Sequence, residues 1–404
     1  MAISPAELKR VTERGVSDII VRQEFVKLLE EGKPLRLKMG FDPSRPDIHL
    51  GHVVGLRKLR QLQDLGHQLI LIVGDWTAQI GDPSGRSATR PMLTHDEVME
   101  NAQSYLQQFF KVVDRDRAQV VYQSEWFGKF SLADVIGLTG RFTVAQFLER
   151  DDFAKRFSEH RPIAITELLY PLLQAYDSVA IESDVEFGGT DQMFNLLVGR
   201  ELQGMMGQRP QQCFLMPILV GTDGVQKMSK SLDNYVGVDE PPDDMFGKIM
   251  SLPDELIVSY FDYLTDTPED DLVEMTQSIA GQTVNPMDLK KKLAEDITRV
   301  FHDKDSAIAA RERFERVVQQ RSLPEDMPVV TISSLVGPRW SNALVSAGLV
   351  SSVSEGKRMI SQGAVELFPP SGASRKLADD SQFQPPEPGT AVKVGRRRFA
   401  SLQE

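Results

Sequence analysis

The stretch Leu69-Ile70-Leu71-Ile72-Val73 is a continuous apolar run that ends at Gly74. A run without polar alternation is typical of a strand that is buried on both faces of a parallel sheet. A short strand is also expected at residues 35–40, before a helix at 49–65, and further strands at 119–122 and 213–220. Strands that alternate with helices predict right-handed crossovers and therefore an α/β fold with a parallel sheet.

The alternation does not continue through the whole chain. Mostly helical patterns interrupt it after Ser124, and a helical, highly charged region follows Pro241. Three prolines within residues 323–340 predict a linker after the helical region. The sequence pattern after the linker predicts helices at 342–347 and 354–362 and strands at 364–368 and 391–394. The expected regions are an α/β domain at 1–240 with an insertion at 124–165, a helical domain at 241–322, a linker at 323–340 and a small α+β domain at 341–404.

Composition excludes several classes of protein. The 404 residues are 41% hydrophobic and 26% charged, which is ordinary for a globular protein and excludes disorder as the main state. No run approaches the roughly 20 apolar residues of a membrane span, and residues 1–10 have no apolar signal core. The single cysteine, Cys213, excludes an internal disulfide and a cysteine-cluster metal site. A soluble cytoplasmic protein is expected.

Charge is distributed unevenly along the chain. The net charge is −12, of which residues 341–404 contribute +2 and the preceding residues −14. An acidic body argues against a protein that coats nucleic acid uniformly. The basic balance of the tail predicts an anionic partner there, with a solvated mixed-charge tail as the alternative.

Two short motifs follow predicted strands. His49-Leu50-Gly51-His52 begins a helix, where unpaired N–H groups suit a phosphate and the glycine leaves room for a flat ring. Lys227-Met228-Ser229-Lys230-Ser231 follows the last strand of the α/β pattern, and its lysines and hydroxyls could surround a polyphosphate. Alone, each motif could be an ordinary surface feature. Their order and their common position after strands favour a nucleotide-handling site.

A third group of polar residues lies on one predicted helix. Tyr170, Gln174 and Asp177 are spaced i, i+4 and i+7, which places them on one face. The face could be the wet side of an amphipathic helix or the wall of a binding pocket.

These motifs resemble a known family. HLGH and KMSKS are similar to the two signatures of class I aminoacyl-tRNA synthetases. Four further segments resemble the bacterial tyrosyl-tRNA synthetases in sequence and in order: GFDP at 40–43, GDPSG at 81–85, QAYD at 174–177 and GGTDQ at 188–192. The resemblance covers nearly the whole chain.

The resemblance implies a Rossmann-like catalytic domain, an α-helical tRNA-binding domain and a small RNA-binding domain. It also implies ATP-dependent ligation of L-tyrosine to its tRNA through tyrosyl-adenylate, to supply translation. ATP is then a substrate accompanied by Mg²⁺, and no permanent prosthetic group or dedicated metal site is expected. A homodimer would form through the insertion at 124–165.

Residue roles follow from the resemblance, position by position. The catalytic residues would be His49, His52, Lys227, Lys230, Ser231, Arg86 and Arg90. ATP would be bound by Asp42, His49, Gly51, His52, Gly189, Asp191 and Lys230. Tyrosine would be bound by Asp82, Tyr170, Gln174, Asp177 and Gln192. RNA would be bound by Lys357, Arg358, Arg396, Arg397 and Arg398.

Lys38 departs from part of the family, because many tyrosyl enzymes have a tyrosine there that touches the substrate hydroxyl. This leaves the second partner of the hydroxyl open. Two other functions are also considered. A tryptophanyl enzyme on the same scaffold is disfavoured because a carboxylate such as Asp177 suits a phenol better than an indole. An RNA-binding protein without ligase activity is disfavoured because both signatures are intact.

Overall fold

A computed structural model describes residues 3–43, 47–81, 93–319, 327–395 and 398–404. Its contacts divide the chain into two units, Met1–Asp303 and Lys304–Glu404. The finer division expected at residues 240, 322 and 340 stays a prediction. Within the described ranges, no helix is both long and apolar enough to cross a membrane.

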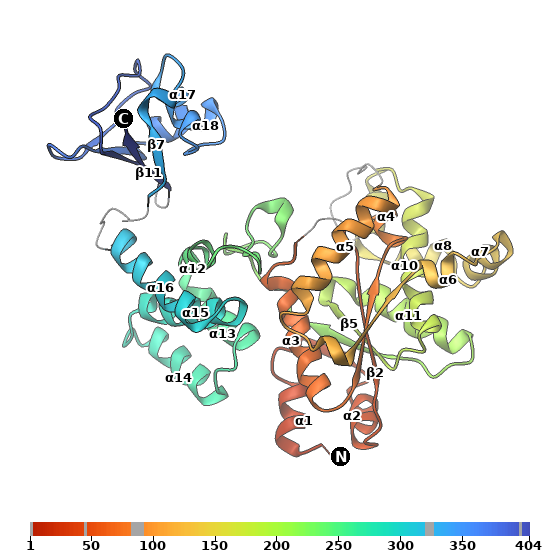
Figure 1. Ribbon diagram of the computed structural model, residues 1–404. Coiled ribbons are helices and arrows are strands. Elements are labelled where there is room, and N and C mark those ends of the chain that lie inside the picture. Colours follow the sequence, from red (N-terminus) through yellow and green to blue (C-terminus); the bar gives the residue numbers. More distant parts are fainter. Residues whose placement is uncertain (1–2, 44–46, 82–92, 320–326, 396–397) are drawn as a thin grey trace. The chain divides into compact units, whose positions relative to one another are not determined.

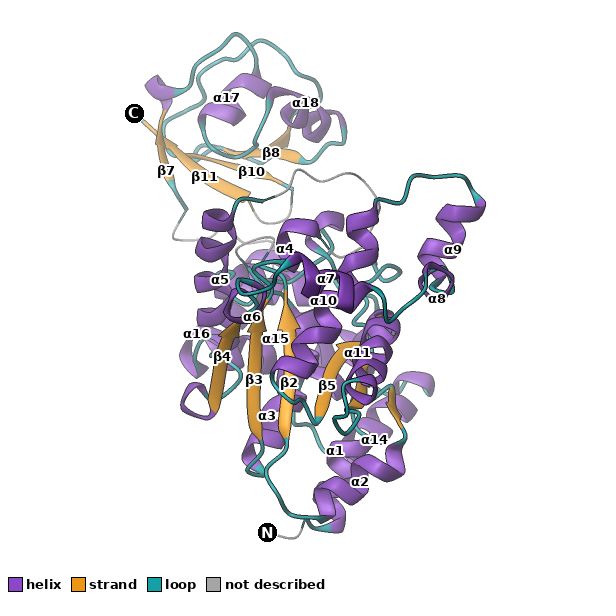
Figure 2. Cartoon of the chain, turned by 90° about the vertical axis from the view of Figure 1, so that its right-hand side faces the viewer, coloured by secondary structure: helices purple, strands orange, loops and turns teal. Residues whose placement is uncertain are grey.

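A six-stranded sheet forms the centre of the first unit (Figures 1 and 2). Its order is β1-β6-β5-β2-β3-β4; the last five strands are parallel and β1 is antiparallel to β6. The expected α/β fold with a parallel sheet is therefore confirmed. The strands are β1 Asp18–Ile20, β2 Arg36–Phe41, β3 Gln68–Val73, β4 Ala118–Tyr122, β5 Val185–Gly189 and β6 Gln212–Met216.

Helices cover both faces of this sheet. Figure 1 shows α3 and α5 on one face and α10 and α11 on the other. The run Leu69 to Val73 in β3 is fully buried between them, which is why it needs no polar residue. The helices up to α11 are α1 Pro5–Thr12, α2 Arg22–Glu30, α3 Leu50–Asp64, α4 Thr77–Ile80, α5 His95–Phe109, α6 Ser124–Phe127, α7 Leu132–Thr139, α8 Val144–Phe147, α9 Asp151–Ser158, α10 Ile165–Ala180 and α11 Met193–Met205.

The strand order reverses between β2 and β5. From β2 the chain moves outward through β3 to β4, and it then returns to β5 on the other side of β2 and continues to β6. At such a switch point, neighbouring loops diverge and leave a crevice at the carboxyl ends of the strands. The fold thus predicts a ligand site beyond Phe41 and Gly189.

Strand β6 is shorter than expected. It ends at Met216, before Pro217, whereas the apolar pattern predicted a strand over 213–220. Proline cannot donate to a sheet, so the remaining apolar residues leave the strand. Within β6, Cys213 is fully buried and its thiol donates to the Leu196 carbonyl at 3.4 Å. Burial raises the pKa of this thiol to about 12.

A helical region completes the first unit. It consists of α12 Pro242–Met250, α13 Ile257–Leu264, α14 Glu269–Ala280 and α15 Pro286–Phe301. Earlier in the chain, the expected insertion contains α6 to α9, and several apolar side chains there are exposed: Leu132 (74%), Ile136 (62%), Val144 (60%), Phe157 (63%) and Ile165 (79%) at the start of α10.

The second unit contains helix α16 Lys304–Phe314 and a small α+β domain with its own apolar core around Leu344 and Val365. Its five-stranded sheet has the order β7-β11-β10-β8-β9. The elements are β7 Val329–Thr331, α17 Trp340–Ser346, α18 Val353–Ser361, β8 Val365–Phe368, β9 Arg375–Lys376, β10 Thr390–Val394 and β11 Arg398–Gln403. Arg398 was expected to follow the last strand, but it begins β11, a strand that the sequence pattern did not predict.

Candidate functional site

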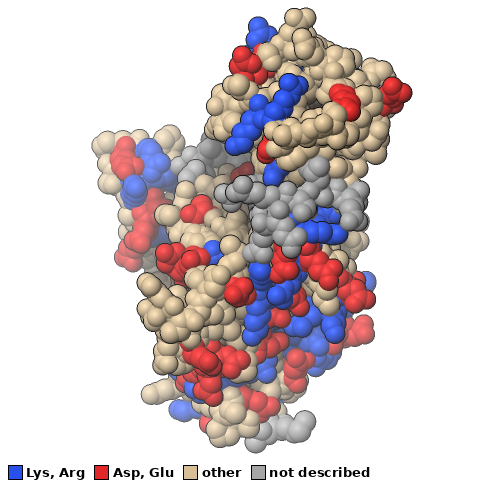
Figure 3. Space-filling model, turned by 90° about the vertical axis from the view of Figure 1, so that its left-hand side faces the viewer, with Lys and Arg blue, Asp and Glu red and all other residues tan. Residues whose placement is uncertain are grey.

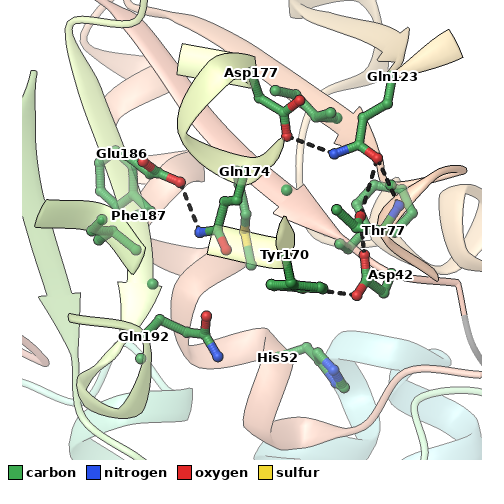
Figure 4. A pocket seen from close by; sticks show the side chains of 18 of the residues that line it. Asp42, His52, Thr77, Gln123, Tyr170, Gln174, Asp177, Glu186, Phe187 and Gln192 are labelled. Atoms are coloured by element: carbon green, nitrogen blue, oxygen red, sulfur yellow. Dashed lines mark hydrogen bonds between the residues drawn. The ribbon is translucent and has the colours of Figure 1, made fainter. Parts of the chain in front are cut away.

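A cavity of about 250 Å³ opens at the carboxyl ends of β2 and β5, at the switch point of the sheet. Figure 4 shows its side chains pointing toward a common space from β2, β5 and α10. The cavity brings together seven residues that were predicted to bind ATP or tyrosine: Asp42, His52, Tyr170, Gln174, Asp177, Gly189 and Gln192.

The HLGH motif forms the amino end of α3. His49 is the N-cap, and its Nδ1 accepts from the Gly51 N–H at 3.2 Å; His52 Nδ1 accepts from the His49 N–H at 3.2 Å. Each Nδ1 is an acceptor, so in a neutral ring the proton sits on Nε2. A Cβ at Gly51 would lie 2.9 Å from the His49 ring, which explains the glycine.

Both histidines are uncharged near neutral pH. Burial, followed by the nearby charges, holds the pKa of His49 well below its ordinary value, and burial with Lys230 nearby lowers the pKa of His52 to about 4. Neutral rings with protonated Nε2 atoms are hydrogen-bond donors that need no counter-ion. This suits an N-terminal helix site for phosphate.

The KMSKS loop is held by a residue outside the motif. Asn234 is buried; its Oδ1 accepts from the Ser229 N–H at 2.8 Å, and its Nδ2 donates to the Lys227 carbonyl at 3.1 Å and to Asp223 Oδ2 at 2.7 Å. Gly221 packs so closely against Asn234 that a Cβ there would lie 2.3 Å from the amide nitrogen. The amide therefore joins the first half of the motif, Lys227 to Ser229, to the turn at Asp223.

The two motifs lie side by side. His49 and Gly237 form an antiparallel bridge, and the Leu50 N–H donates to the Val236 carbonyl at 3.0 Å. Lys230 Nζ donates to the carbonyl of Asp47 and lies 3.5 Å from its Oδ2, while Lys227 Nζ lies 2.9 Å from Asp191 Oδ2. The lysines of KMSKS thus pair with one carboxylate just before HLGH and with one inside GGTDQ.

Helix α10 lines the cavity with the predicted polar face. Tyr170 donates its hydroxyl to Asp42 Oδ2 at 2.8 Å, and Thr77 donates to Asp42 Oδ1 at 2.7 Å. These two hydrogen bonds fix the orientation of the Asp42 carboxylate just beyond the carboxyl end of β2. A Cβ at Gly74 would lie 2.3 Å from both Asp42 and Thr77, so this arrangement requires glycine.

Asp177 is buried, about one and two turns of α10 beyond Gln174 and Tyr170. Gln123 Nε2 donates to its Oδ2 at 2.8 Å and Trp126 Nε1 donates to its Oδ1 at 3.1 Å. Burial raises the pKa of Asp177 to about 7, and the positive charge of Lys38 limits this rise. Neither Gln123 nor Trp126 was predicted, because no spacing connects them to α10.

Lys38 lies next to the cavity but is fully engaged. Its Nζ lies 2.8 Å from Glu186 Oε1 and donates to the Gln174 carbonyl and to Ser178 Oγ, each at 2.7 Å. An ammonium group has three protons, and these contacts use all three. The sequence left open whether Lys38 contacts the substrate hydroxyl. Because its three protons are already used, Lys38 has no donor left for that hydroxyl.

Several predicted residues cannot be placed in the cavity. Asp82, Arg86, Arg90, Arg396 and Arg397 lie outside the described residues. Lys357 and Arg358 are exposed on α18 in the second unit, and Arg398 pairs with Glu355 at 2.9 Å. Ser231 lies in a 3₁₀ turn, Lys230–Leu232, with its hydroxyl 2.9 Å from that of Ser229.

Comparison with known proteins gives one consistent result. Residues 30–319 match the family model described as tRNA synthetases class I (W and Y). The tyrosine--tRNA ligase of Dehalococcoides mccartyi (strain CBDB1) is 55% identical over 98% of both chains, and that of Thermotoga maritima is 50% identical over 98% of this chain and 97% of its own.

Solved structures agree on the fold. The tyrosyl-tRNA synthetase of Archaeoglobus fulgidus, complexed with L-tyrosine, matches with a TM-score of 0.63 and 25% identity over 76% of this chain and 99% of its own. A C-terminally truncated mitochondrial tyrosyl-tRNA synthetase of Aspergillus nidulans, at 20% identity and a TM-score of 0.64, covers 77% of this chain and 94% of its own. Motifs, geometry and relatives together show that the chain belongs to the tyrosyl branch of the class I tRNA synthetases, among the bacterial tyrosine--tRNA ligases.

Proposed function

We propose that this protein joins L-tyrosine to its tRNA in two ATP-dependent steps and so supplies tyrosyl-tRNA for translation in the cytoplasm. One observation carries the proposal. One cavity at the switch point is lined both by His52, at the amino end of α3, and by the buried carboxylate of Asp177.

In the first step, the tyrosine carboxylate attacks the α-phosphate of ATP and pyrophosphate leaves. The Asp177 carboxylate would accept the phenolic hydroxyl, while Tyr170, Gln174 and Asp82 would surround the ammonium group and Gln192 would approach the carboxylate. Such positioning removes much of the entropic cost of bringing two reactants together. Asp42, Gly189 and Asp191 would contact the adenylate part.

Charge stabilisation would come from the two motifs. Neutral His49 and His52 would donate from Nε2 to phosphate oxygens, and Gly51 would leave space for adenine. Lys227, Lys230 and Ser231, with Arg86 and Arg90, would hold the departing pyrophosphate, where charge develops. Because Lys227 and Lys230 pair with Asp191 and Asp47 in the free protein, ATP would take over these lysines from the carboxylates.

Magnesium would enter with ATP, bound to its phosphates. The carboxylates beside the motifs, Asp47 and Asp191, are each paired with a lysine, so the donor set does not resemble a hard-cation cage. No cluster of three possible ligands lies among the described residues. We therefore assign no metal ligand to this chain.

In the second step, a terminal ribose hydroxyl of the tRNA attacks the activated carbonyl and AMP leaves. We propose that residues 241–322 and the small domain bind the tRNA, the latter through Lys357, Arg358, Arg396, Arg397 and Arg398. Lys357 and Arg358 are exposed, and Figure 3 shows a row of Lys and Arg side chains on the small domain, drawn at the top. Phosphate contacts of this kind supply affinity without sequence selectivity.

We also propose that two copies associate through the insertion. The exposed apolar residues of α7 to α9 form the kind of surface that monomeric proteins rarely leave in water. A second copy of this chain would cover it symmetrically.

The proposed activity is tested by isotope exchange between pyrophosphate and ATP. We expect exchange that depends on L-tyrosine and is negligible with tryptophan or without an amino acid. Exchange with tryptophan alone would support the tryptophanyl alternative, in which Asp177 has no phenol to bind. No exchange with either amino acid would favour an RNA-binding protein without ligase activity.

A further inference from the structure

A buried polar network beside the cavity determines which end of the Gln174 amide faces the ligand. Gln174 Nε2 donates to Glu186 Oε1 at 3.0 Å, and an ionised carboxylate can only accept. The nitrogen end of the amide is therefore held at Glu186. Figure 4 shows this contact, with the amide oxygen turned away from Glu186 toward the space between Tyr170 and Gln192.

Lys38 pairs directly with Glu186. The two residues are opposite each other in the register of β2 and β5, both are almost fully buried, and Nζ lies 2.8 Å from Oε1. The ammonium group beside it compensates the cost of burying a carboxylate at this depth. A neutral group in its place, such as an amide, could donate as well as accept, and could then bind either end of the Gln174 amide.

The remaining contacts complete the network. Glu186 Oε2 accepts from Ser178 Oγ at 3.2 Å and from Gln211 Nε2, so the carboxylate is saturated. Asn195 Nδ2 donates to Gln174 Oε1 at 3.1 Å and to Gln192 Oε1 at 2.9 Å. A carbonyl oxygen has two lone pairs, so one remains at Gln174 for a ligand that donates.

We propose that the buried Lys38–Glu186 pair is a positioning device that holds the Gln174 carboxamide with its oxygen toward the cavity, and so selects an ammonium group at that place. The inference rests on the proposed function, in which the amino acid occupies this cavity. Lys38 and Glu186 act through Gln174. An ammonium group has only donors, so a reversed amide would present N–H groups to it and repel it.

The first test is Glu186→Gln, which preserves the shape of the side chain but lets either end of Gln174 pair with it. In tyrosine-dependent pyrophosphate exchange, we expect the KM for tyrosine to rise about tenfold to a hundredfold, because a hydrogen bond to a charged group is lost. The KM for ATP should stay within twofold. The inhibition constant of 3-(4-hydroxyphenyl)propionate, which is tyrosine without its amino group, should also stay within twofold.

A second variant covers the case in which a lone buried Lys38 prevents folding. Lys38→Met/Glu186→Gln removes both charges, and we expect it to be more stable than the single variant while keeping the raised KM for tyrosine. The matched control is Lys58→Met, which removes another buried lysine, one that bonds to the carbonyls of Arg10 and Arg14 and to Gln61, away from Gln174. It should lower the melting temperature and leave the KM for tyrosine within twofold.

Two results would overturn the inference. One is an unchanged KM for tyrosine in both charge-removing variants. The other is an inhibition constant of the amine-free analogue that rises by the same factor as the KM, since this would indicate general distortion of the pocket. Absence of tyrosine-dependent exchange in the unmodified protein would instead contradict the proposed function, and the inference with it.

Discussion

At the scale of single residues, the protonation of Asp177 links the pocket to stability. Its pKa is about 7 in the folded protein against an ordinary 3.8, so between about pH 4 and pH 7 the folded form binds more protons than the unfolded form. The free energy of unfolding should therefore fall as pH rises through this window, by at most about 1.4 kcal/mol per pH unit. Asp177→Asn removes the titrating group.

We expect the stability of Asp177→Asn relative to the unmodified protein to increase from pH 5 to pH 7 and to level off by pH 8, measured by urea unfolding without substrates. Glu97→Gln is the control, because capping hydrogen bonds from Thr94 lower the pKa of Glu97. The contribution of Glu97 to the free energy of unfolding is therefore constant over this pH range. A difference that does not change with pH would mean that Asp177 is ionised throughout.

At the scale of elements, the KMSKS loop should depend on Asn234. Asn234→Ala removes the amide that joins Ser229, Lys227 and Asp223, and takes a part-buried hydrogen bond from each of them. We expect single-turnover adenylate formation to slow at least tenfold, with the KM for tyrosine within twofold, because the loop serves the transition state more than the tyrosine pocket.

The control for this prediction is Asn285→Ala, which removes the asparagine that caps α15 by accepting from the Met287 N–H. Its loss should cost about 1 kcal/mol of stability without changing the rate. A rate for Asn234→Ala equal to that of the control would show that the loop keeps its conformation without the amide.

Local patterns predicted what local chemistry determines. The apolar run at β3, the α3 helix with its histidine cap and the single polar face of α10 each follow from periodicity within one element. The predicted length of β6 was wrong because the apolar pattern was followed past Pro217. Glu186, Gln123 and Asn234 were not found, because they reach the site only through the pairing of strands far apart in sequence. The role of Lys38 could not be settled for the same reason: its partner, Glu186, lies 148 residues away along the chain.

At the scale of the whole molecule, the exposed apolar face of α7 to α9 predicts self-association. We expect a mass of about twice 45.2 kDa in sedimentation equilibrium. The double change Leu132→Asp/Ile136→Asp should shift it to the mass of one chain, because charges cannot be buried unpaired at an interface. Val273→Asp, at a 52% exposed position on α14, is the matched control and should leave the mass unchanged. A single-chain mass for the unmodified protein would contradict the proposed dimer.

Cys213 has a practical consequence. Its thiol lies within β6 with no exposed surface and a pKa of about 12, so at neutral pH hardly any reactive thiolate is present to meet an alkylating reagent. Maleimide reagents should therefore leave the folded native chain unlabelled. A cysteine introduced at Val225, which is 83% exposed beside the KMSKS loop, would carry a fluorophore at one defined position. Motion of that loop during turnover could then be followed by spectroscopy without first removing a native cysteine.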